Sequence, residues 1–135
     1  MRRLIKNIAA MTLVLLLLSA AQVNKKIVDW KAPAEADKVS NPLKGNAVAT
    51  VAGKKLYVQL CAVCHGEKGK GDGIAAISLN PKPANHTSKK VQAQTDGAIF
   101  WKITTGKPPM AAYKATLTDT QRWQLVNYIR ELVKK

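Results

Sequence analysis

The segment Cys61-Ala62-Val63-Cys64-His65 constrains this chain more than any other feature. Two cysteines separated by two residues and followed at once by a histidine form the pattern that attaches a c-type haem. Each thiol can add to one vinyl group of the porphyrin, and the histidine can then reach the iron from the proximal side. The pentapeptide therefore predicts one covalently bound haem c, with Cys61 and Cys64 as its attachment points and His65 as its first axial ligand.

Three other roles of the two cysteines remain open at this point. A structural zinc site needs four Cys or His ligands, whereas the chain has 2 Cys and 2 His in total. A redox dithiol belongs at a helix N-terminus within alternating strands and helices, but this motif follows a helical pattern and precedes a glycine-rich loop. A plain disulfide is the third alternative. The ligand count argues against zinc, and the surrounding pattern argues against a redox dithiol. Haem remains the preferred interpretation over all three.

Residues 1–21 have the pattern of a cleaved export signal. A basic start is followed by an apolar run at residues 8–18 and then by the small residues Ser19, Ala20 and Ala21. Retention as a membrane anchor is the alternative, but residues 8–21 are fewer than the about 20 that span a bilayer. We therefore expect a mature protein in the periplasm or an equivalent compartment.

The chain is strongly basic, with 22 Lys and Arg against 8 Asp and Glu and a formal net charge of +14. Removal of residues 1–21 would leave 19 basic residues against 8 acidic ones, a formal charge of +11. Nucleic acid is not an expected partner, because no base-reading motif is present and export would separate the chain from the genome. Acidic protein surfaces suit this charge best, and peripheral contact with anionic lipid headgroups is also compatible with it.

The sequence divides into three parts: the signal at residues 1–21, an extended arm at residues 22–46, and one small domain at residues 47–135. The arm carries prolines and charges without a sustained helical or strand period. We expect it to lie partly on the domain, with Trp30 as a packing point, and a tether without fixed contacts is the alternative.

The domain pattern is helical throughout, so we predict an all-α fold. From Val51 a helical period leads into the haem motif, on the face formed by Gly53, Leu56, Tyr57, Leu60, Cys61 and Cys64. Four glycines at residues 66–73 then favour a loop. Thr95-Asp96 begins a short helix, which Gly106 can end in a left-handed cap.

The last helix has the clearest pattern. Thr118-Asp119-Thr120-Gln121 fits a capping box. An apolar stripe follows, formed by Leu125, Tyr128, Ile129, Leu132 and Val133. Trp123 falls on the polar side of this helix and has no assigned role.

These elements resemble the class I cytochromes c over roughly residues 51–133. Residues 53–61 are similar to the family's N-terminal helix and residues 125–129 to its C-terminal helix. With its segments Gly69 to Gly73 and Asn80 to Pro83, the chain is more similar to the small, exported bacterial members with a single haem than to the mitochondrial protein. The resemblance implies three to five helices around one haem, with Gly53 and Tyr57 of the first helix meeting Leu125 and Tyr128 of the last.

Met110 is the predicted second axial ligand. It is the only methionine outside residues 1–21, and Gly106-Lys107-Pro108-Pro109 forms a rigid approach to it. A methionine that fills a gap in the core is the alternative. His86 is the rival ligand, but its polar neighbours favour a solvated surface histidine whose replacement should change little.

The resemblance also implies second-sphere and pocket residues. A proline carbonyl is expected to accept a hydrogen bond from the ring of His65, with Pro83 preferred over Pro81. Tyr57 is expected to contact the haem, and Phe100 and Trp101 to line its Met110 side. Ordinary helix packing away from the porphyrin is the alternative for the last two.

With both axial positions occupied, we expect a one-electron carrier between respiratory or other periplasmic redox complexes, not an enzyme, and monomeric when free. The alternatives are a fixed haem subunit of a larger oxidoreductase, a haem enzyme with an open iron, and a dithiol protein without haem. The family's exposed haem edge implies a docking role toward an acidic partner for Lys68, Lys70, Lys107 and Lys114. A merely solvated basic face is the alternative for these lysines.

Overall fold

The computed structural model describes residues 29–134. The predicted export signal, and residues 22–28 of the predicted arm, lie outside the described residues. The chain separates into residues 1–30 and a compact unit formed by residues 31–135. Among the described residues, no helix has the length and apolar character needed to cross a membrane.

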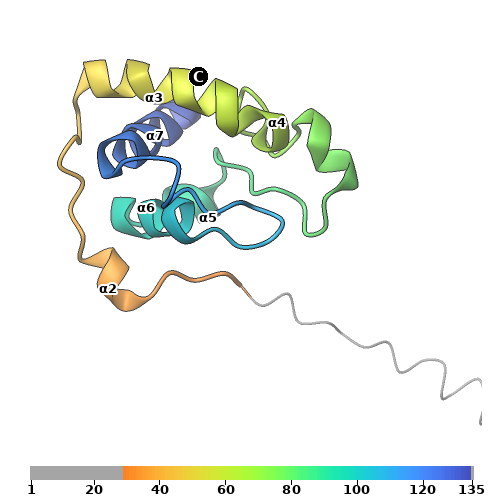
Figure 1. Cartoon of the computed structure of the whole chain (residues 1–135), viewed down its shortest axis with the longest axis horizontal. Helices are drawn as coiled ribbons and strands as arrows, with labels where there is room; N and C mark the ends of the chain where they lie inside the picture. Colours follow the sequence, from red (N-terminus) through yellow and green to blue (C-terminus); the bar gives the residue numbers. More distant parts are fainter. Residues whose placement is uncertain (1–28, 135) are drawn as a thin grey trace, which may run out of the picture. The chain divides into compact units, whose positions relative to one another are not determined.

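The compact unit is built from helices (Figure 1). They are α2 (Ala34–Asp37), α3 (Ala47–Leu60), α4 (Ala62–His65), η1 (Ile74–Ser78), α5 (Lys89–Gln92), α6 (Asp96–Thr105), α7 (Asp119–Glu131) and η2 (Leu132–Lys134). Within residues 29–134 the β pairing is limited to one isolated bridge between Lys107 and Met110. The predicted all-α class is therefore confirmed.

Side-chain caps fix where the long helices begin. The backbone N–H of Ala98 donates to the hydroxyl of Thr95 (3.0 Å), which starts α6 as predicted. Thr118 and Gln121 form the predicted capping box at the start of α7. Gly106 ends α6 with a positive φ of 61°, but its ψ of 174° differs from that of a left-handed helical residue, so the predicted cap type is wrong.

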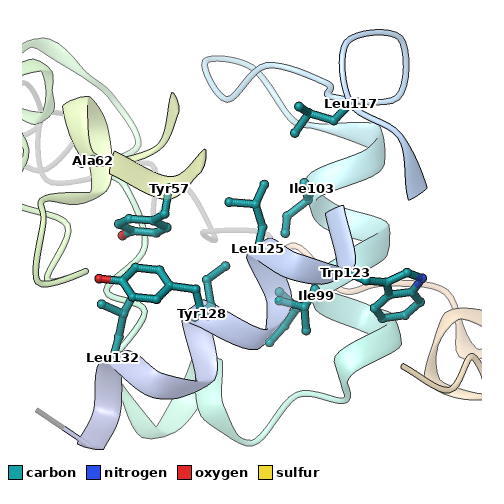
Figure 2. Packing of buried hydrophobic residues seen from close by; sticks show 11 residues of the cluster. Tyr57, Ala62, Ile99, Ile103, Leu117, Trp123, Leu125, Tyr128 and Leu132 are labelled. Atoms are coloured by element: carbon teal, nitrogen blue, oxygen red, sulfur yellow. The ribbon is translucent and has the colours of Figure 1, made fainter. Parts of the chain in front are cut away.

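The first and last long helices cross closely, as predicted, and α3 lies across α7 in Figure 1. A Cβ atom at Gly53 would lie 1.9 Å from the carbonyl oxygen of Gln124 and 3.2 Å from the nitrogen of Leu125. One helical turn further along, the rings of Tyr57 and Tyr128 meet edge to face with centroids 5.1 Å apart. Figure 2 shows these two rings facing each other between the helices. Glycine at position 53 thus permits the contact that brings the two aromatic rings together.

The hydrophobic core lies around α7 (Figure 2). It contains Tyr57, Ala62, Ile99, Ile103, Leu117, Trp123, Leu125, Val126, Tyr128, Ile129 and Leu132. Trp123, which the sequence pattern assigned to the polar side, is only 6% exposed. Val133, which the pattern assigned to the apolar stripe, is 51% exposed. The stripe is therefore shifted, because α6 packs against α7 on the side where Trp123 lies.

Residues 31–46 belong to the same compact unit as the helices, although the sequence pattern assigned them to an arm. The carbonyl of Ala36 in α2 lies so close to α6 that a Cβ atom at Gly97 would be 2.0 Å from its oxygen. The side-chain amide of Asn41 donates to Asp96 (3.0 Å) and to Asn127 (2.8 Å). These bonds fix the segment to α6 and α7 at once, so the free tether is excluded for residues 31–46.

Candidate haem site

The two cysteines lie on a single helical turn at the junction of α3 and α4. The backbone N–H groups of Cys64 and His65 both donate to the carbonyl of Cys61, at 3.1 and 2.9 Å. Both thiols are free and partly buried. Burial, followed by the nearby Cys64, raises the pKa of the Cys61 thiol to about 12. Both sulfur atoms therefore belong to one short rigid turn that ends in His65.

His65 is buried, and one of its ring nitrogens is already in use. Its Nδ1 lies 2.9 Å from the backbone oxygen of Ala84, an acceptor, so Nδ1 carries the proton and Nε2 has the free lone pair. Burial lowers the pKa of the ring, whereas the bond to Ala84 acts in the opposite direction. A neutral ring with a free Nε2 is the form that binds a metal.

The prediction that the carbonyl of Pro83 accepts the hydrogen bond from the His65 ring is wrong by one residue. The carbonyl of Pro83 lies against Gly71, where a Cβ atom would be only 2.6 Å from the proline oxygen. The next carbonyl, that of Ala84, therefore meets the histidine ring. Which carbonyl faces the ring depends on how two loops meet, and this packing is not visible in the sequence.

The glycine-rich loop folds back over the haem motif. The N–H of Gly71 donates to the carbonyl of His65 (2.8 Å), and that of Gly73 donates to the carbonyl of Cys64 (3.1 Å). At Gly73 a Cβ atom would lie 2.4 Å from the oxygen of Val63. These contacts hold the carbonyl side of α4 in place, so the turn that carries the cysteines is supported from outside.

Met110 lies in a tight loop whose geometry follows from its flanking bonds. Lys107 and Met110 exchange two backbone hydrogen bonds, of 3.1 and 2.8 Å, around Pro108 and Pro109. The Met110 side chain is partly buried and packs against the hydrophobic core, as Leu60 and Cys61 also do. Its position as an axial ligand stays a prediction.

Tyr113 is a residue of this site that the sequence analysis missed. Its hydroxyl donates to the carbonyl of Leu60 (3.2 Å), which joins the Met110 loop to the end of α3. Its pKa is raised by burial and then by the nearby Cys61 and Cys64, so the phenol lies near both thiols. The sequence signal that could have identified Tyr113 is an aromatic residue three positions after the predicted ligand Met110.

His86 is not the solvated surface histidine that its polar neighbours favoured. Its ring stacks on the ring of His65, with centroids 4.1 Å apart and an interplanar angle of 18°. Its Nδ1 lies 3.1 Å from the hydroxyl of Tyr57. Burial, and secondly the proximity of His65, lower the pKa of His86 to about 3. The flanking residues Asn85 and Lys89 are exposed, which is why the local sequence was misleading.

The remaining predicted pocket residues divide into two groups. Tyr57 is fully buried and donates its hydroxyl proton to the carbonyl of Gly66 (3.2 Å), directly after the haem motif. Phe100 stacks on Trp123 (centroids 4.0 Å, 17°) with the guanidinium of Arg122 above its ring at 4.8 Å. Phe100 thus joins α6 to α7 through its stack on Trp123. Trp101 is half-buried on α6. Haem contacts of all three stay predictions.

The chemistry of this donor set fits a covalently attached haem c. Two free thiols lie on one turn, and the adjacent histidine is neutral with Nε2 as its unused ring nitrogen. Within the described part of the chain, no three side chains of Cys, His, Asp or Glu gather as ligands of a bare metal ion.

Comparisons with known proteins agree with this chemistry. The family model described as cytochrome c oxidase, cbb3-type, subunit III matches residues 48–129. Among solved structures, a chain of the reducing HAO-like protein complex of Kuenenia stuttgartiensis is similar, with 31% sequence identity and a TM-score of 0.62. The match covers 70% of this chain and 49% of that one, so this chain spans about half the length of its structural relative. None of the curated protein sequences matches.

Proposed function

Because the chain belongs to the family of cbb3-type cytochrome c oxidase subunit III and is a small c-type cytochrome, we propose that it transfers single electrons as the haem subunit of a larger redox complex. It carries one haem c on Cys61 and Cys64, with His65 and Met110 as axial ligands. The observation that carries the proposal is the turn from Cys61 to His65, whose histidine ring is bonded through Nδ1 to Ala84.

When bound, haem c supplies an iron that takes up and releases one electron at a time. The chain's own part is to hold, orient and shield that group. Cys61 and Cys64 would hold the porphyrin on a rigid turn, and the carbonyl of Ala84 binds Nδ1 of His65 and leaves Nε2 as the unused ring nitrogen. The thioether of Met110 would be the second ligand of the iron, so that oxygen and substrates would be excluded and the ferrous state favoured.

Assembly into a complex is supported by the comparisons. The matched family is named for an oxidase subunit, and the matched solved structure is a multi-subunit redox complex. A free carrier is the second candidate. The formal charge of +11 expected without residues 1–21 supports it, because a strongly basic surface suits transient docking on acidic partners. We place either activity in the periplasm on the basis of the export pattern at residues 1–21.

Optical spectra of the native protein and of Met110→Ala test the ligation. The parent should show the weak far-red absorption of ferric iron bound to sulfur, and it should not bind carbon monoxide. Met110→Ala should keep the covalent haem, lose that absorption and bind carbon monoxide, whereas Met110→His should stay closed to it at a lower reduction potential. A Met110→Ala protein that keeps the absorption and excludes carbon monoxide would show that Met110 is not the ligand.

The same native preparation separates the two candidates and checks the compartment. If the native protein elutes from a size-exclusion column together with a large partner, it is a subunit of a complex. If it elutes as a monomer, it is a free electron carrier. Intact mass reports the haem count and the mature N-terminus, which is expected near Gln22. A mass without any haem would contradict the whole proposal.

A further inference from the structure

We propose that His86 is a positioning residue for the axial ligand: its stacked ring fixes the orientation of the His65 imidazole plane above the haem. The inference rests on the proposed function, since it concerns the histidine that would bind the iron. It starts from the stack of the two rings, with centroids 4.1 Å apart and planes within 18° of parallel.

The bond to Ala84 alone does not fix the His65 ring. It holds Nδ1 at 2.9 Å from one carbonyl oxygen. Coupled rotations about the two side-chain bonds can keep this distance while the ring plane turns. A second ring lying flat against the first blocks that turn, because a rotated imidazole would collide with its neighbour. His86 therefore restrains the rotation of the His65 ring plane, which the hydrogen bond to Ala84 leaves free.

His86 can act as a restraint because it is itself held on several sides. Its backbone N–H donates to Gly69 (2.6 Å), and its carbonyl accepts from the side chain of Gln92 (2.6 Å). A Cβ atom added at Gly69 would lie 3.2 Å from the Cβ of His86, so the backbone there is packed tightly. The position of the ring is thus set by the glycine loop and by α5 together.

Tyr57 anchors the ring itself and defines its tautomer. The tyrosine has one hydroxyl proton, which it donates to the carbonyl of Gly66 (3.2 Å). Its oxygen can then accept a hydrogen bond from the Nδ1–H of His86 (3.1 Å), and this arrangement satisfies both bonds. The Tyr57 ring also meets the His86 ring edge to face at 5.7 Å.

The rings form a continuous series from the helix crossing to the axial ligand. Tyr128 packs on Tyr57 at 5.1 Å, Tyr57 on His86 at 5.7 Å, and His86 on His65 at 4.1 Å. Tyr128 and Tyr57 lie between α3 and α7, the most extensively packed pair of helices among the described residues. The orientation of the ligand plane is therefore tied to the core and not to a surface loop.

The test is the proton NMR spectrum of the ferric holoprotein, in which the four haem methyl resonances report the orientation of the axial histidine plane. His86→Phe keeps a planar ring at the stack, and His86→Leu keeps apolar bulk without one. The Phe variant should retain the parental order and spread of the methyl resonances. In the Leu variant, the four methyl resonances should lie closer together or appear in a different order. Tyr57→Phe, which loses only the hydroxyl, should shift the pattern in the same direction to a smaller extent.

Two outcomes would overturn the inference. If the Leu variant keeps the parental pattern, His86 only fills space; if the Phe and Leu variants change it equally, the stacked ring is not what orients His65. Should His86→Leu fail to attach haem, Tyr57→Phe decides, and an unchanged pattern there rejects the anchoring by Tyr57 and the inference with it. If the parent protein lacks the optical spectrum of His/Met ligation, the proposed function itself is refuted, whatever the His86 variants show.

Discussion

Trp123 lies among polar residues in the sequence, yet it is only 6% exposed and stacks on Phe100. Deletion of a buried indole removes apolar contacts and leaves a cavity, so Trp123→Ala should lower the free energy of unfolding by roughly 3–5 kcal/mol. Trp123→Phe, which keeps a ring against Phe100, should cost clearly less. Urea unfolding of the holoprotein measures both, and a loss under about 1 kcal/mol for the alanine variant would contradict the burial described above.

The crossing of α3 and α7 is decided by one glycine. Alanine is a better helix former than glycine by about 1 kcal/mol, so propensity alone predicts that Gly53→Ala stabilises the protein. A Cβ atom at this position would lie 1.9 Å from the backbone oxygen of Gln124, and the helices must separate to admit it. We therefore expect a net loss of roughly 1–3 kcal/mol in the free energy of unfolding.

Val48→Ala is the matched control for this helix, because Val48 is 80% exposed on the same element. It should change the free energy of unfolding by no more than about 0.5 kcal/mol. Chemical denaturation of the two variants under one set of conditions gives the comparison. A stabilised Gly53→Ala protein would mean that the two helices do not approach as closely as the structure indicates.

The whole molecule is distinguished by its charge, which is +14 for the full chain and +11 without residues 1–21. Lys107 and Lys114 are exposed on either side of Met110, so an acidic partner that approaches there would be attracted over short range. Electron transfer to the native partner should slow by about tenfold or more from low to physiological salt, as the Debye length falls to about 8 Å. Lys107→Glu combined with Lys114→Glu should flatten this dependence, measured by stopped-flow kinetics.

Lys54→Glu combined with Lys55→Glu is the control, since both lysines are exposed on α3 and the change in net charge is the same. It should leave most of the salt dependence in place. Equal slopes for the two double variants would show that overall charge, and not a local surface beside Met110, governs the association.

The sequence by itself determined the features that rest on neighbouring residues. The turn from Cys61 to His65, the caps at Thr95 and Thr118 and the all-α class are local, because each depends on spacing or on a bond within one helical turn. The close crossing at Gly53 also followed from the sequence, but only through the resemblance to a family with that packing.

The tertiary structure alone decided the partners of His65 and the burial of Trp123. The acceptor is Ala84 instead of Pro83, the ring of His86 lies on His65, and Trp123 is buried under Phe100. Each of these contacts joins segments from different parts of the chain, so a shift of one residue in a loop changes the partner without changing the local pattern. A polar neighbourhood along the chain, such as that of His86, says little about the neighbours that packing supplies.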